Sequence, residues 1–106
     1  MKWITVSNKN YVCEVTLNRP EVRNAFDPMM IEEITQTFKS IPESSRVVVL
    51  KGAGEVFCSG ADLEWMKSMV NYSFEENKND SLKLYEMFKA IEVCRVPVLA
   101  VVQGAA

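Results

Sequence analysis

Residues 56–66 contain the residue types that could bind and polarise a carbonyl group. Gly60 permits a tight turn, Ala61 leaves its backbone N–H uncovered, and Asp62 is a favourable N-cap for a following helix. N–H groups at such a turn have no partner within the helix, so they can donate to a carbonyl oxygen. They bind that oxygen more strongly as it becomes negative. A turn of this kind, with the amide of Ala61 at its centre, can therefore bind a carbonyl oxygen.

The same residues also fit an ordinary connection between a strand and a helix, with a glycine turn, an aspartate cap and no ligand. Such connections are common, so spacing alone favours this simpler interpretation. Asp62 suits a helix cap better than a general base, and Glu64, one turn into the helix, is expected to face solvent. The sequence contains no histidine to activate Cys58, which is therefore expected to be a small buried side chain rather than a nucleophile.

Two continuous apolar runs, at residues 47–50 and 98–102, indicate parallel strands covered on both faces. Residues 63–70 after the turn predict a short helix. A capping box at Ser73 then predicts a longer helix, with an apolar stripe of Leu84, Met87, Phe88 and Ile91. A strand, helices and a second strand in this order imply a right-handed crossover between parallel strands.

The elements before this crossover are a predicted hairpin and a helix. Residues 3–6 and 11–17 are β-rich and are separated by turn formers, and the second run places its apolar side chains on one face, namely Tyr11, Cys13, Val15 and Leu17. Residues 18–26 form a polar loop of functional length. Asp27 caps a helix that begins with Pro28 and buries a stripe of Met30, Ile34, Phe38 and Ile41, with Glu32, Glu33, Gln36 and Lys39 largely away from it.

Composition narrows the class of protein. The 106 residues are 48% hydrophobic and carry a formal net charge of -2 without long charged blocks, which indicates one α/β domain and argues against a nucleic-acid partner. Three widely spaced cysteines and no histidine give no metal pattern and suggest free thiols in a reducing compartment. No run is long enough for a signal peptide or a membrane span, so we expect a soluble, cytoplasmic protein.

Three separated segments resemble the amino-terminal portion of the crotonase, or enoyl-CoA hydratase/isomerase, superfamily. They are residues 15–20 (VTLNRP) with 24–25, residues 57–63 (FCSGADL) and residues 96–106 (VPVLAVVQGAA), and the likeness runs along the whole chain, 1–106. Residues 60–67 (GADLEWMK) and 72–77 (YSFEEN) look most like the methylglutaconyl-CoA hydratase subgroup. The resemblance implies a spiral of ββα units, truncated here, and assembly of the full-length protein as trimers or hexamers.

The resemblance also implies a chemistry and its residues. Family members bind acyl-CoA thioesters and hold the thioester carbonyl between two backbone N–H groups, the first of which matches Ala61. Coenzyme A is then part of the substrate, and no separate cofactor is implied. The substrate-binding positions implied are Arg23 for a CoA phosphate, Ala25 for the pantetheine arm, Trp65 and Met66 for the acyl pocket, and Ser59, Gly60, Asp62 and Leu63 around the turn. Solvated surface for Arg23 and core packing for Trp65 and Met66 are alternatives. Arg19 is expected to anchor its loop, and Lys67 to be solvated.

The family's second N–H donor and its acid and base glutamates match positions after residue 106. We therefore expect a fragment that does not hydrate an enoyl-CoA alone. Enoyl-CoA isomerisation, a non-catalytic assembly role, and a nucleotide-binding module built on the turn at residues 51–54 remain alternatives, although no phosphate-binding glycine motif is present. We also expect residues 98–102 to expose apolar surface and to promote association.

Overall fold

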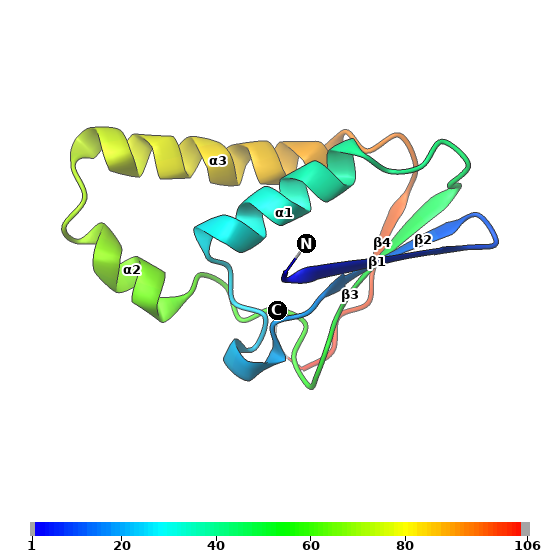
Figure 1. Cartoon of the computed structure of the whole chain (residues 1–106), viewed down its shortest axis with the longest axis horizontal. Coiled ribbons are helices and arrows are strands. Elements are labelled where there is room, and N and C mark those ends of the chain that lie inside the picture. The colour runs from blue at the N-terminus through cyan, green and yellow to red at the C-terminus, as the bar shows by residue number, and fades with distance from the viewer. Residues whose placement is uncertain (1, 105–106) are drawn as a thin grey trace.

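A computed structural model describes residues 2–104, and its centre is a 4-stranded sheet in the order β1-β2-β3-β4 (Figure 1). The strands are β1 (Ile4–Lys9), β2 (Val12–Leu17), β3 (Val47–Gly52) and β4 (Val98–Ala100). β1 pairs antiparallel with β2, while β2 with β3 and β3 with β4 are parallel pairs, as predicted. The helices are α1 (Pro28–Lys39), α2 (Leu63–Met69) and α3 (Phe74–Glu92), with a 3₁₀ turn, η1 (Pro20–Val22), between β2 and α1.

The hairpin between β1 and β2 turns later than predicted. Asn10 and Tyr11 have φ angles of 51° and 66°, which are the left-handed values of a two-residue hairpin turn. Lys9 and Val12 close the ladder on either side. Tyr11 is therefore 60% exposed, and its predicted place on the buried face is wrong, whereas Cys13, Val15 and Leu17 are buried as predicted.

The core lies between one face of the sheet and the helices α1 and α3, which run side by side in Figure 1. Val15, Val48 and Leu50 point into it. The prediction that the central strands are covered on both faces is wrong for the part of the chain described, because burial alternates along β3 and Leu99 of β4 is 59% exposed. We call the uncovered side, with Val47, Val49 and Leu99, the open face of the sheet.

Helix α1 begins as predicted, with the Asp27 side chain accepting from Met30 N at 2.8 Å. Its stripe of Met30, Ile34 and Phe38 is buried. Glu33 departs from the prediction that it lies away from this stripe, since only 9% of it is exposed. Its Oε1 accepts from the backbone N–H of Trp3 at 2.9 Å, so this carboxylate joins α1 to the residue before β1.

Helix α3 begins with the predicted capping box, in which the Ser73 side chain accepts from Glu76 N and the Glu76 side chain accepts from Ser73 N. Met87 is 1% exposed and Ala90 is 8% exposed, so this side of the helix packs on the core. Phe88 is 54% exposed, and its predicted place in the buried stripe is wrong.

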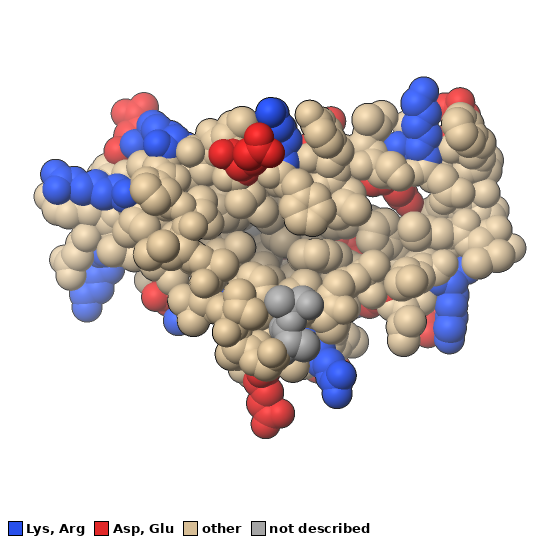
Figure 2. Space-filling view, turned by 180° about the vertical axis from the view of Figure 1, so that it is seen from behind, with Lys and Arg blue, Asp and Glu red and all other residues tan. Residues whose placement is uncertain are grey.

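β4 ends at Ala100, two residues earlier than predicted, although Val101 N still donates to Leu50 O at 2.8 Å. Leu99, Val101 and Val102 are each more than half exposed, which confirms the predicted apolar surface on this segment. Figure 2, which views the molecule from behind, shows charged side chains around the rim and an uncharged surface across the middle.

Candidate oxyanion-binding site

The loop between β3 and α2 is held against the loop between β2 and α1. Phe26 N donates to Gly60 O and Asp62 N donates to Phe26 O, both at 2.7 Å, which forms a parallel bridge between Phe26 and Ala61. In a parallel bridge the flanking residues supply the groups that bond to the partner. The N–H of Ala61 itself therefore points away from Phe26.

The Ala61 amide has no acceptor among the residues that the structure describes. Ala61 is an exposed residue, so this N–H is open to solvent or to a ligand. The adjacent Gly60 has a φ of 99°, a left-handed value that an L-residue with a side chain rarely adopts. The sequence assigned Gly60 to a tight turn for this reason, and the turn is present.

Asp62 caps α2 as predicted, its Oδ1 accepting from Glu64 N at 2.8 Å and from Trp65 N at 3.1 Å. Its Oδ2 lies 2.9 Å from Arg19 Nη1. The amides of Trp65 and Glu64 and the Arg19 guanidinium hold the pKa of this carboxyl below its ordinary value of 3.8, against the opposing effect of burial. Asp62 is thus an ionised helix cap rather than a group poised to take up a proton.

Arg19 connects the starts of two helices. Besides Asp62, its guanidinium contacts the α1 cap Asp27, with Nη2 to Oδ2 at 3.4 Å, and Nη1 donates to Ala25 O at 3.0 Å. The prediction that Arg19 anchors its loop is confirmed. Both backbone groups of Ala25 have partners, because its N–H donates to Val22 O at 3.1 Å.

Asn24 is the residue of this region whose importance sequence reasoning missed. It is fully buried, and its Nδ2 donates to the carbonyls of Ala53 and Val56, both at 2.9 Å, and of Phe57 at 3.1 Å. Its Oδ1 accepts from Arg19 N at 2.7 Å. The signal available in the sequence was a polar side chain beside the predicted site residues. If such a side-chain amide is buried, its N–H donors and its oxygen acceptor all need partners.

The same packing fills the space on one side of the turn at residues 51–54. A Cβ built on Gly52 would meet Phe57 O at 2.5 Å and Asn24 Nδ2 at 2.8 Å. Protein atoms therefore fill the space beside Gly52, whereas a hollow of about 390 Å³ borders the same turn at Ala53 and Gly54.

A cleft of about 710 Å³ opens beside Ala61. Most of the predicted site residues line it, together with three further side chains; in full, the lining is Glu21, Val22, Arg23, Ala25, Ser59, Ala61, Asp62, Leu63, Glu64 and Met66. Residues from η1, from the loop and from the first turn of α2 thus meet around the free amide. Gly60 and Trp65 are the predicted site residues that do not line it.

Trp65 packs in the core cluster, with 8% of its surface exposed, and its Nε1 donates to Asp80 Oδ2 at 3.4 Å. This is the alternative of core packing, so the structure does not bring Trp65 to the cleft. Leu63 and Met66 do reach it and are 69% and 48% exposed. Arg23 is exposed at the rim and has no ion pair with any described residue.

The other candidate groups take the simpler roles that the sequence favoured. Cys58 is 5% exposed, and burial raises the pKa of its thiol, against the opposing effect of the Gly60 amide that donates to its sulfur. The Glu64 side chain is 89% exposed and lies 4.0 Å from Lys67 Nζ, whose side chain is 73% exposed. Both helix residues are solvated, although Glu64 stands at the edge of the cleft.

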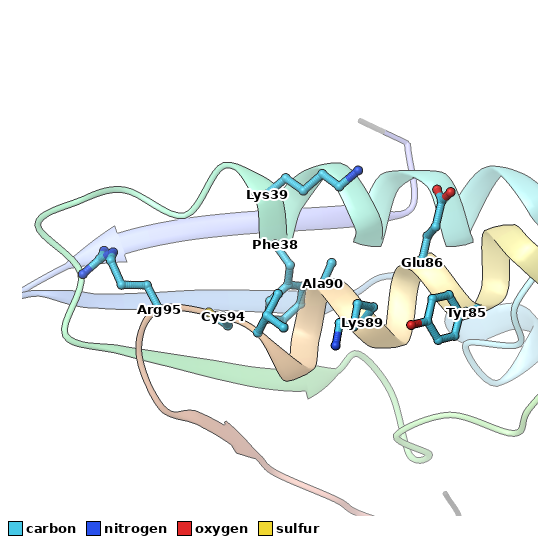
Figure 3. A pocket seen from close by; sticks show the side chains of 9 residues that line it. Phe38, Lys39, Tyr85, Glu86, Lys89, Ala90, Cys94 and Arg95 are labelled. Carbon is cyan, nitrogen blue, oxygen red and sulfur yellow. The ribbon is translucent and has the colours of Figure 1, made fainter.

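A second hollow of about 510 Å³ lies between α1 and α3 and contains none of the predicted site residues (Figure 3). Across residues 2–104 no group of three or more Cys, Asp or Glu side chains is arranged to hold a metal ion. Within the same range, no helix is both long and apolar enough to cross a membrane.

Comparison with known proteins places this geometry in a family. Residues 7–106 match the family model for enoyl-CoA hydratase/isomerase. A probable enoyl-CoA hydratase of Mycobacterium bovis is 33% identical over 97% of this chain, and a mitochondrial Delta(3,5)-Delta(2,4)-dienoyl-CoA isomerase of mouse is 35% identical over 92% of it. A crystal structure of a crotonase-type enoyl-CoA hydratase/isomerase from Legionella pneumophila superimposes with a TM-score of 0.93 at 39% identity, covering 98% of this chain.

The chain spans 40% of the Mycobacterium protein, 41% of the Legionella chain and 33% of the mouse isomerase. Its fold is thus the amino-terminal portion of a crotonase fold, as the sequence resemblance predicted. From its fold and from the family model that matches nearly all of it, this chain belongs to the enoyl-CoA hydratase/isomerase family.

Proposed function

We propose that this chain supplies the thioester-binding half of an acyl-CoA active site, with the Ala61 N–H as one donor to the thioester carbonyl. The single observation that carries the proposal is that the Ala61 N–H has no acceptor among the described residues while Ala61 itself lines an open cleft. Two hydrogen bonds, at residues 60 and 62, hold this segment in place. A donor fixed before the substrate arrives costs no reorganisation when charge develops on the oxygen. Removing one such donor typically lowers kcat by about 10²–10³-fold.

The cleft suits the two ends of an acyl-CoA. Leu63 and Met66 offer apolar side chains for the acyl group on the α2 side. Arg23 offers a guanidinium for a CoA phosphate at the rim, because a planar fork of N–H donors matches phosphate oxygens. Both assignments belong to the proposal, as does the absence of any cofactor other than the coenzyme A of the substrate.

We infer enolate chemistry as the reaction class. When the oxygen of water bonds to C3 of a 2-enoyl thioester, a base takes one proton from the water and the π electrons of the C2–C3 bond move toward the carbonyl, whose oxygen the N–H donors stabilise. The resulting enolate then takes a proton at C2 from an acid. Shifting a double bond between carbons uses the same stabilised enolate. The Mycobacterium relative favours hydration, and the mouse dienoyl-CoA isomerase at 35% identity favours isomerisation, while the family model covers both reactions.

The acid and base for either reaction belong, in this proposal, to residues outside the 106 present. The chain incubated with crotonyl-CoA should then show no loss of enoyl absorbance above the buffer rate. Hydration that depends on Glu64, tested with Glu64→Gln, would contradict this part of the proposal. A role in assembly as a trimer or hexamer, a cytoplasmic location and the narrower likeness to methylglutaconyl-CoA hydratases remain predictions from the sequence.

The binding half of the proposal is tested by NMR on the ¹⁵N-labelled chain, titrated with butyryl-CoA, a saturated thioester that cannot react. The Ala61 amide resonance should move downfield with butyryl-CoA and much less with free coenzyme A. Replacing Ala61 by lactic acid exchanges the N–H for an ester oxygen. This should weaken butyryl-CoA binding about five- to tenfold, the effect of one hydrogen bond.

Ala61→Gly is the matched control, because it alters the side chain and keeps the N–H. It should bind butyryl-CoA nearly as well as the unmodified chain. If butyryl-CoA and free coenzyme A move the same resonances by the same amount, or if the ester variant binds equally well, the Ala61 amide is not the thioester donor.

A further inference from the structure

Helix α3 has an exposed apolar face opposite the side that packs on the core. At 3.6 residues per turn, Tyr85 lies about 200° around the helix from the buried Met87. Leu82, Tyr85 and Phe88 are 50%, 61% and 54% exposed. Consecutive apolar residues at spacings of three form one surface on a helix, so these side chains make a continuous patch rather than isolated exposures.

Opposite charges stand at the two ends of this patch. Lys78 and Glu92 lie on the same side of the helix as Tyr85 and at equal distances from it along the chain. Lys78 has no ion pair with any described residue. Glu92 has only a 3.8 Å contact with Lys89, in which the Glu92 side chain is 75% exposed. We call Lys78, Leu82, Tyr85, Phe88 and Glu92 the exposed face of α3.

This face is complementary to itself under a two-fold rotation. We propose that α3 pairs antiparallel with α3 of a second copy of this chain. Tyr85 then lies at the two-fold axis, Leu82 packs on Phe88 of the second copy, and Lys78 meets Glu92 of the second copy about 10 Å from the axis on each side. In this dimer each charged side chain of the patch pairs with an opposite charge on the second copy, and the apolar centre of the patch is buried.

The arrangement of charge favours a second copy over an unrelated partner. A uniformly acidic or basic surface would leave one end of the patch facing like charge, whereas the antiparallel copy pairs both ends. The hollow of Figure 3 borders this face, since Tyr85 lines it.

The predicted association is weak. A single pair of helices buries less than the roughly 1,200 Å² of a stable complex, so we expect a dissociation constant in the range of about 10 µM to 1 mM. The pairing is thus to be sought at high concentration. It is independent of the acyl-CoA proposal, because none of its residues lines the cleft beside Ala61.

Sedimentation equilibrium on the 106-residue chain tests the pairing through reversal of charge. Lys78→Glu and Glu92→Lys should each raise the dimer dissociation constant about tenfold, because each places two like-charge contacts in the dimer. The double variant K78E/E92K restores opposite charges across the interface and should return the constant to near its original value. Lys83→Glu, the same change on an exposed residue of the other side of α3, should leave it unchanged.

The charge swap separates this dimer from association through the open face of the sheet. If the chain stays monomeric up to about 1 mM, the top of the expected range, the proposal fails. It also fails if both single reversals associate as the original does, which would indicate the sheet, or if the double variant stays as weak as the singles. Circular dichroism of each variant checks that α3 remains folded, and Tyr85→Ser, which removes the central ring without changing charge, should weaken the dimer even where a charge variant is unstable.

Discussion

At the scale of single residues, Asn24 does most to shape the site loop. It is fully buried at a φ of 56°, and its side chain bonds to carbonyls at residues 53, 56 and 57. Asparagine tolerates this left-handed conformation better than most residues. Asn24 therefore turns the backbone of its own loop and, through its side chain, holds the loop at residues 53–57 in place.

Replacing Asn24 by glycine should destabilise the chain by about 2–3 kcal/mol, because buried carbonyls lose their donor while the left-handed backbone remains allowed. Urea unfolding measures the change. Asn18→Gly, at an exposed position in the same loop, is the control and should cost less than about 1 kcal/mol. Equal losses for the two variants would show that the side-chain bonds of Asn24 carry no particular weight.

At the scale of elements, α1 and α2 begin at one cation. The Arg19 guanidinium contacts the caps Asp27 and Asp62, which belong to helices far apart in sequence. Both carboxylates also accept from N–H groups of their helices, so the charge of each is stabilised twice. The relative placement of the two helix starts depends on this arrangement.

The free energy of unfolding should depend on pH through Asp62. The pKa of Asp62 in the folded chain lies below the ordinary value of 3.8, so near that pH the unfolded chain binds more protons than the folded one. The contribution of Asp62 to stability is therefore present above about pH 4 and is lost as the pH falls through the folded pKa. Asp62→Asn keeps a capping oxygen but cannot titrate, and should cost on the order of 1 kcal/mol at neutral pH.

Chemical denaturation from about pH 7 to about pH 2 checks this expectation, because this range spans the ordinary Asp pKa of 3.8. The difference in unfolding free energy between the original chain and Asp62→Asn should shrink as the pH falls and vanish at the acid end. A difference that is constant across the range would mean that Asp62 contributes only as a cap.

Local signals predicted the helix starts but not every buried face. Caps at Asp27, Asp62 and Ser73 depend on a few adjacent residues, and all three are present. Phe88 and Glu33 were misplaced because burial depends on which neighbouring element covers a helix, and that is decided by tertiary packing. Phe88 is 54% exposed, and Glu33 accepts from the backbone N–H of Trp3, a partner 30 positions away.

At the scale of the whole molecule, the sheet has one covered and one open face. The family resemblance predicted the crotonase arrangement, while apolar runs alone predicted strands covered on both sides. Along β3 and β4 only one side is covered by α1 and α3 within the described chain. The continuous apolar character of residues 47–50 therefore identified the strand correctly but overestimated its cover.

The open face should govern non-specific association of the chain. Leu99→Lys places a charge on an exposed edge strand, and static light scattering at high concentration should fall at least about twofold. Gln36→Lys, at an exposed position of α1 away from the sheet, is the control for added charge alone. If both lysines lower scattering equally, net charge rather than the β4 edge is responsible.

The bridge between Phe26 and Ala61 indicates which positions to vary when the binding properties of this site are engineered. The orientation of the Ala61 amide is set by a residue 35 positions earlier, on a segment that Arg19 and Asn24 hold in place. A directed-evolution library confined to the glycine turn would therefore leave unchanged the positions that orient this N–H. Randomising residues 19–26 should give the larger spread of butyryl-CoA affinities.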